Sequence, residues 1–152
     1  MYFLEKKTKE SIEIDILINF LKNRGESYSQ SLINPMKEEP TDIDYNGEKY
    51  QITIGDRDEI QKRRKATSRF QIYSSIRSID SKIVVTLLES ILESKAKKSD
   101  KNTVLLIQLE GGDYLEDIFI ENLSLFTKEN NRLFYVWKNV YAVFPNKNII
   151  IK

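Results

Sequence analysis

Asp42 and Gln51 lie on either side of a predicted β-turn in residues 38–53, EEPTDIDYNGEKYQIT. Asn46-Gly47 favours a two-residue hairpin loop of type I′, because both residues tolerate the positive φ angles that this turn requires. With that loop, Asp42 lies directly opposite Gln51 on the neighbouring strand. Oxygen atoms of the two side chains could then reach one hard cation or one water molecule.

The same register divides the hairpin into two faces, because side chains alternate along each strand. The polar face is predicted to carry Asp42, Asp44, Lys49, Gln51 and Thr53, and the apolar face Ile43, Tyr45, Tyr50, Ile52 and Ile54. A half-exposed hairpin with no special function shows the same pattern, with Asp44 and Lys49 as an ion pair worth at most about 1 kcal/mol. The pattern alone leaves both interpretations open.

Composition limits the chemistry that is available. The chain has 152 residues, the size of one domain, with 24 Lys and Arg against 23 Asp and Glu. Any nucleic-acid binding would therefore need a local basic patch rather than bulk charge. The chain contains no cysteine and no histidine, so a reaction would have to use carboxylates, lysine, tyrosine or a bound hard cation.

No stretch of the sequence resembles a signal peptide or a membrane-spanning segment. We therefore expect a cytoplasmic protein with no membrane partner.

A first helix is predicted over residues 9–24, where apolar residues recur at helical spacing and a glycine follows. Its apolar residues are Ile16, Leu17, Phe20 and Leu21. Glu13 lies one turn before them, so its side chain is expected to point toward the protein rather than into water. Glu10 lies a further turn back, on a similar side of the helix.

The remaining pattern alternates between strands and helices. After the first helix we expect a strand at 28–33, the hairpin, a loop or exposed helix at 57–69, a helix from Ser81 to Leu92, a strand at 103–109, a helix at 114–128, and strands at 133–137 and 140–145 joined by a turn at 138–139. The strand at 103–109 is apolar almost throughout, as expected of a strand buried on both faces of a parallel or mixed sheet. This order predicts an α/β sandwich.

Pro40, Asp42, Gln51 and Thr53, with a carboxylate on a preceding helix and this order of elements, resemble the PD-(D/E)XK, or restriction-endonuclease-like, nucleases. In that superfamily an Asp near a Pro begins one strand, and an acidic residue and a Lys two positions later lie on the adjacent strand. The resemblance covers most of the chain through the order of elements, but its motif rests on few positions. It implies one domain, residues 1–152, with a three-layer α/β/α fold and a mixed central sheet.

The resemblance also implies roles for single residues. Asp42 would be the metal-binding aspartate, Gln51 would stand in place of the second acid, and Thr53 in place of the lysine. Glu13, or failing it Glu10, would be the helical carboxylate. The implied activity is hydrolysis of phosphodiester bonds in DNA or RNA, with Mg²⁺ or Mn²⁺ held by Asp42, Glu13 and Gln51.

The chain departs from the motif at two of its positions. Gln51 supplies no charge, so a cation should bind weakly, and Thr53 cannot replace an ammonium group. Lys49 could reach partway toward the site, and Lys62 or Arg63 could fold over it. The chain is then either an active Mg²⁺-dependent endonuclease or a catalytically degenerate relative.

A basic segment follows the hairpin and could provide the local patch. Its cations are Arg57, Lys62, Arg63, Arg64, Lys65 and Arg69. They could contact nucleic-acid phosphates, or they could form a solvated helix face paired with nearby acids. A non-catalytic module that binds nucleic acid or protein through this segment is therefore the alternative function, and a homodimer is compatible with either.

Three other features are predicted to be structural. The lysines between residues 95 and 101 suit a helix C-terminus. Gly111-Gly112-Asp113 reads as a tight connection between a strand and a helix. Trp137 is expected to pack within the sheet core rather than stack on a base.

Overall fold

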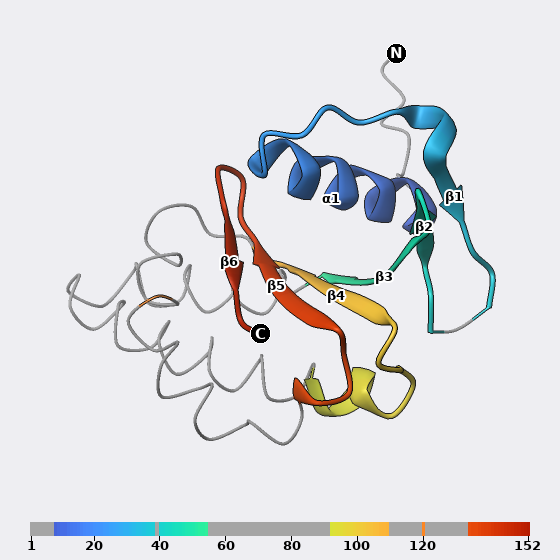
Figure 1. The fold of residues 1–152 in the computed structure, drawn as a ribbon, viewed down its shortest axis with the longest axis vertical. Helices are drawn as coiled ribbons and strands as arrows, with labels where there is room; N and C mark the ends of the chain where they lie inside the picture. Colours follow the sequence, from blue (N-terminus) through green and yellow to red (C-terminus); the bar gives the residue numbers. More distant parts are fainter. Residues whose placement is uncertain (1–7, 39, 55–91, 110–119, 121–133) are drawn as a thin grey trace, which may run out of the picture.

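The described part of the chain contains a mixed sheet of six strands in this computed structural model (Figure 1). The structure describes residues 8–38, 40–54, 92–109, 120 and 134–152. The strands lie in the sheet in their sequence order: β1 (Ile33–Pro35), β2 (Ile43–Tyr45), β3 (Glu48–Ile54), β4 (Thr103–Gln108), β5 (Asn139–Val143) and β6 (Asn148–Ile150). The first three are antiparallel neighbours, β3, β4 and β5 run parallel, and β6 is antiparallel to β5. The predicted mixed α/β class is confirmed.

Helix α1 (Lys9–Asn23) begins and ends as its sequence predicts. The Thr8 hydroxyl accepts a hydrogen bond from the Ser11 N–H at 3.1 Å, which caps the first turn. Gly25 follows the helix with φ of +74°, and its N–H donates to the Lys22 carbonyl at 2.9 Å. A residue with a side chain would be strained at that φ, so glycine is suited to this helix end.

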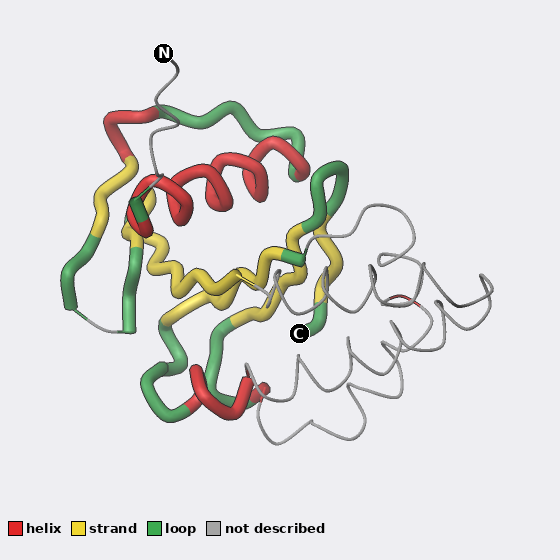
Figure 2. Tube along the Cα trace, turned by 180° about the vertical axis from the view of Figure 1, so that it is seen from behind, coloured by secondary structure: helices red, strands yellow, loops and turns green. Residues whose placement is uncertain are grey.

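Helix α1 covers one face of the sheet, as Figures 1 and 2 show from opposite sides. The buried cluster between them consists of Ile16, Leu17, Phe20, Leu21, Ile43, Tyr50, Ile52, Val104, Leu106 and Val143. The Phe20 ring packs edge-on against Tyr50 and Tyr141, with ring centroids 5.9 and 4.9 Å apart. The apolar face predicted for the helix and the hairpin is therefore the core on this side.

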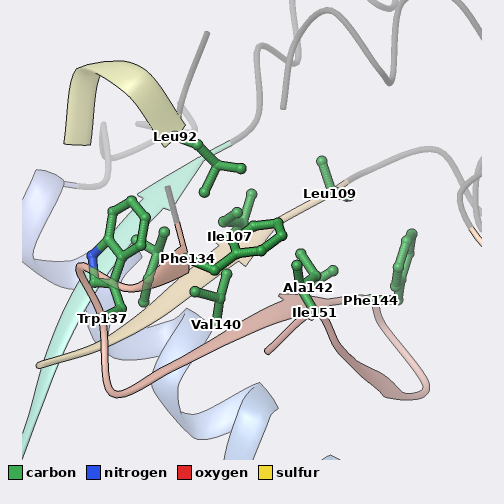
Figure 3. Close-up of a cluster of buried hydrophobic side chains, with 10 residues drawn as sticks. Leu92, Ile107, Leu109, Phe134, Trp137, Val140, Ala142, Phe144 and Ile151 are labelled. Atoms are coloured by element: carbon green, nitrogen blue, oxygen red, sulfur yellow. The ribbon is translucent and has the colours of Figure 1, made fainter. Parts of the chain in front are cut away.

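A second apolar cluster covers the opposite face of the sheet (Figure 3). It consists of Leu92, Leu105, Ile107, Leu109, Phe134, Trp137, Val140, Ala142, Phe144 and Ile151. Strand β4 serves both clusters, because Val104 and Leu106 face α1 while Leu105 and Ile107 face away from it. The prediction that this strand is buried on both faces is confirmed.

The hairpin has the predicted register. Ile43 pairs with Tyr50 and Tyr45 with Glu48, around a loop in which Asn46 has φ of +51° and Gly47 of +87°. Its second face differs from the simple expectation of a solvated strip. Gln51 is only 3% exposed, because the second apolar cluster covers that face of β3.

The strand predicted at 28–33 is wrong for most of its length. Residues Gln30–Leu32 form a 3₁₀ helix, η1, and strand β1 begins only at Ile33. The Ser29 and Ser31 hydroxyls lie 2.9 Å apart, and the Leu32 N–H donates to the Ser29 carbonyl at 3.0 Å. The 3₁₀ turn thus uses main-chain groups that a strand would leave for the sheet ladder.

The strand predicted at 133–137 is wrong over its described residues, 134–137, and the turn predicted at 138–139 is wrong at Asn139, which is already in a strand. The Trp137 N–H donates to the Phe134 carbonyl at 3.4 Å in a turn, and β5 already begins at Asn139. The Lys152 ammonium donates to the carbonyls of Phe134 and Trp137, so a contact from a distant part of the chain holds this turn. Strand β6, which was not predicted, pairs with β5 instead.

Several predicted elements lie outside the described residues. They are the segment 57–69, the helix from Ser81 as far as residue 91, and the helix at 114–128. Residues 92–96, at the end of the Ser81 helix, are helical. No helix among the described residues is long and apolar enough to cross a membrane.

Asparagine side chains fasten the C-terminal half of α1 to the turn between β5 and β6. Asn19 and Asn23 donate to the Phe144 carbonyl at 3.0 and 2.8 Å. In return, the Asn148 amide donates to the Phe20 carbonyl at 2.9 Å and its oxygen accepts from Asn23 at 2.9 Å. These bonds fix α1 along the sheet and so set the position of Glu13 near its other end.

Replacing Asn148 should therefore loosen α1. Asn148→Ala removes two partly buried hydrogen bonds and should lower the free energy of unfolding by about 1 to 3 kcal/mol. Lys97→Ala, at an exposed position, should change it by less than about 0.5 kcal/mol. Urea unfolding followed by circular dichroism measures both, and equal stability of the two variants would contradict the proposed anchor.

Candidate functional site

Asp42 lies beside β3, immediately before β2 begins. Its N–H donates to the Tyr50 carbonyl at 2.8 Å, and its Oδ2 accepts from the Ile52 N–H at 2.7 Å. The carboxylate thus takes the place of a main-chain acceptor in the sheet ladder. These two bonds lie on either side of Gln51 along the strand, so Asp42 is opposite Gln51 as the hairpin register predicts.

Glu13 reaches the same place from α1. It is 9% exposed and belongs to the helix face that carries Ile16 and Leu17 into the core. Its Oε2 is buried and has no hydrogen-bond partner among the described residues. An unpartnered buried carboxylate oxygen is costly, because water no longer solvates its charge.

The environment of Glu13 raises its pKa from 4.5 to about 7. Burial is the main cause, since it disfavours the charged form. The negative charge of Asp42 and a hydrogen bond between the two side chains raise the pKa further, while the positive charges of Lys9 and Lys95 lower it. The Glu13 carboxyl therefore lies close to that of Asp42.

Two adjacent carboxyl groups in such a place can hold either a proton or a cation between them. A hard divalent ion prefers carboxylate oxygens and would offset both negative charges. Near neutral pH Glu13 could also take up or release a proton during a reaction. The arrangement supports metal binding or general acid-base chemistry.

Gln51 does not point its oxygen at the acidic pair. Its Oε1 accepts a hydrogen bond from the Trp137 indole Nε1 at 3.0 Å, in the cluster on the face of the sheet away from α1. The structure thus brings Glu13 and Asp42 together and places Gln51 beside Asp42 along β3. No group of three or more acidic residues with metal-binding geometry occurs within the described ranges.

The other residues predicted for the site are described by their place on an element and by their exposure. Thr53 is partly buried two positions beyond Gln51 on β3. Lys49 is exposed and lies opposite Asp44, whose Oδ1 accepts from the Gly47 N–H at 3.0 Å. Glu10, the alternative helical carboxylate, is exposed. The predicted nucleic-acid contacts Arg57, Lys62, Arg63, Arg64, Lys65 and Arg69 lie outside the described residues.

Sequence reasoning assigned no site role to Trp137 or Lys95. Trp137 is 86 residues from the glutamine that it contacts, so no local pattern could connect them. Lys95 was assigned to a helix end, and its charge nevertheless acts on Glu13. Lys95 comes shortly before the strand predicted at 103–109, which was expected in the same sheet as the hairpin. That position was the signal available in the sequence.

No protein-family model, curated protein or solved structure matches the chain. The function must therefore be inferred from the site itself.

The raised pKa of Glu13 predicts a loss of stability as the pH rises. Below pH 4.5 the carboxyl is protonated in both the folded and the unfolded chain, so it adds no pH dependence. Between pH 4.5 and about 7 the unfolded chain loses this proton while the folded chain keeps it, so the free energy of unfolding should fall. The loss should be complete above pH 7 and amount to about 1 to 3 kcal/mol.

Glu13→Gln should remove this fall. Urea unfolding of both proteins at pH 4, 6 and 8, with a chelator present, makes the comparison. A wild-type profile that matches the variant would contradict the raised pKa.

The pairing of the two carboxyl groups predicts how the pKa of Glu13 responds to its neighbours. Asp42→Asn keeps an acceptor for the Ile52 N–H but removes a negative charge, so the pKa of Glu13 should fall from about 7 toward 4.5. Lys95→Met removes a positive charge and should raise it. Carbon-13 NMR titration of the glutamate carboxyl measures both, and a pKa unchanged by Asp42→Asn would show that the groups are not paired.

Proposed function

We propose that this chain is a nuclease-like domain that binds Mg²⁺ or Mn²⁺ through Glu13 and Asp42 and hydrolyses phosphodiester bonds in DNA or RNA. One observation carries the proposal: two carboxylates from separate elements meet beside β3, and one of their oxygens is buried with no hydrogen-bond partner among the described residues. Repulsion and poor solvation disfavour such a pair when both groups are ionised. A hard cation would relieve both effects.

The order of elements supports the same proposal. A helix that carries an acid precedes three antiparallel strands, and a parallel strand then joins β3. Asp42 lies immediately before β2, two residues after Pro40, and Gln51 and Thr53 lie on the adjacent β3. These are the positions on which the resemblance to restriction-endonuclease-like nucleases rests, and we extend it to a three-layer fold of that kind.

The residues present suit phosphodiester chemistry without histidine. A bound divalent cation would polarise the phosphate and lower the pKa of a water molecule for in-line attack. Asp42, held rigidly by its bond to the Ile52 N–H, would fix one side of the cation site. Glu13, with its pKa near 7, would supply the second carboxylate and release its proton as the cation binds.

A second candidate function is a non-catalytic module that binds nucleic acid or protein on the same fold. It is favoured by the uncharged residues at the motif positions, because Gln51 and Thr53 provide neither a second acid nor an ammonium group. In that case, the basic residues between Arg57 and Arg69 would carry the binding.

Metal-dependent cleavage separates the two functions. Purified protein with plasmid, single-stranded DNA and RNA should cleave at least one substrate when Mg²⁺ or Mn²⁺ is added. Asp42→Asn and Glu13→Gln should each lower the rate by about 100-fold or more, because each removes a cation ligand. Glu10→Gln, an exposed change on the same helix, should leave the rate within about twofold.

Cleavage that survives Asp42→Asn would contradict the proposed site. Absence of cleavage together with salt-dependent nucleic-acid binding that falls in Arg63→Ala and Arg64→Ala would favour the binding module.

A further inference from the structure

Two lysine side chains flank the acidic pair. Lys9 is exposed and lies one turn before Glu13 on α1, at the spacing that places helical side chains on one face with Cβ atoms about 5 to 6 Å apart. Lys95 belongs to the helical residues 92–96. The positive charge of each ammonium group acts on the Glu13 carboxyl and lowers its pKa. Two elements that are far apart in the sequence therefore bring cations to Glu13.

Lys95 reaches the pair from the other side of the sheet. Leu92 is buried in the apolar cluster on the face away from α1, and Ala96 packs against that cluster. Figure 1 shows this short helix and α1 on opposite sides of the strands. Lys95 lies between Leu92 and Ala96 in sequence and is only partly buried, so its long side chain can extend past the packed residues. The acidic pair thus lies between cations carried on the two faces of the sheet.

The charges of these two lysines are not taken up by ion pairs. No ion pair among the described residues includes Lys9 or Lys95, whereas the Lys138 ammonium lies 3.0 Å from the Glu48 carboxylate. The whole chain has 24 basic against 23 acidic residues, so it attracts a polyanion only where cations are grouped locally. Lys9 and Lys95 form such a group beside the candidate site.

We infer that Lys9 and Lys95 contact phosphate groups of the substrate backbone on either side of the cation site. This inference rests on the proposed function and names described residues that would hold the nucleic acid. An ammonium group binds phosphate oxygens as a point charge, whatever the base sequence. The two acids repel the backbone, and the flanking cations would offset that repulsion. The contacts would be independent of sequence and sensitive to salt.

Salt-dependent oligonucleotide binding tests this inference. Fluorescence anisotropy of short labelled single-stranded and duplex DNA, with a chelator present, gives the affinity between about 50 and 200 mM NaCl. Lys9→Met and Lys95→Met should each weaken binding by about 3- to 10-fold and lower the slope of log affinity against log salt by about 0.7 to 0.9. Lys95→Arg keeps the charge and should bind within about twofold of wild type.

Lys22→Met is the matched control, because it removes an exposed positive charge from the last turn of the same helix. It should bind within about twofold of wild type. Wild-type protein that binds neither oligonucleotide, lysine variants that bind as wild type does, or an equal loss in Lys22→Met would overturn the inference. A loss confined to Arg63→Ala and Arg64→Ala would also overturn it and assign the phosphates to the basic segment. Circular dichroism checks that each variant is folded.

The chelator keeps this test separate from the proposed function. If wild-type protein binds Mn²⁺ and cleaves, but the variants of Lys9 and Lys95 bind oligonucleotides normally, the inference fails and the nuclease proposal stands. If wild-type protein binds no Mn²⁺, the nuclease proposal fails, and the salt slopes still decide whether the two lysines hold phosphate. A change in the pKa of Glu13 in Lys95→Met without any change in the salt slope would limit Lys95 to an effect on Glu13 and contradict the inference.

Discussion

The carboxyl groups of Glu13 and Asp42 share a poorly hydrated position between α1 and β3, and the described fold keeps them there. Asp42 cannot withdraw without giving up its bonds to β3 on either side of Gln51. Glu13 cannot withdraw without moving α1, whose apolar face is packed on the sheet and whose far end is tied to the turn between β5 and β6. Packing elsewhere in the fold therefore offsets the free-energy cost of ionising both carboxyl groups, as is common at functional sites.

Local rules predicted the elements whose residues bond mainly to their sequence neighbours. Asn46-Gly47 defined both the hairpin and its register, because few other residue pairs tolerate the backbone angles of that turn. The spacing of apolar residues and the glycine at its end defined α1, and the uninterrupted apolar run defined β4. From these elements it also followed that Asp42 lies opposite Gln51 and that Glu13 faces inward.

The features that the sequence did not predict depend on contacts between residues that are far apart in the chain. The aromatic run at 133–137 has strong strand propensity, yet the Lys152 ammonium bonds to two of its carbonyls and Trp137 turns into the core. Gln51 was expected on a polar strip, but an indole from far along the chain covers it and takes its oxygen. A single sequence holds no local trace of either contact, so the composition of the second sheet face and the orientation of the amide emerged only in three dimensions.

The central claim is that Glu13 and Asp42 together hold a divalent cation. Anomalous diffraction from crystals soaked in Mn²⁺ tests it most directly, because the signal locates the ion without reference to activity. We predict one peak within about 2.4 Å of an oxygen of each carboxylate, absent from Asp42→Asn crystals soaked in the same way. A peak that persists in Asp42→Asn crystals, or no peak between the two carboxylates at saturating Mn²⁺, would contradict the account.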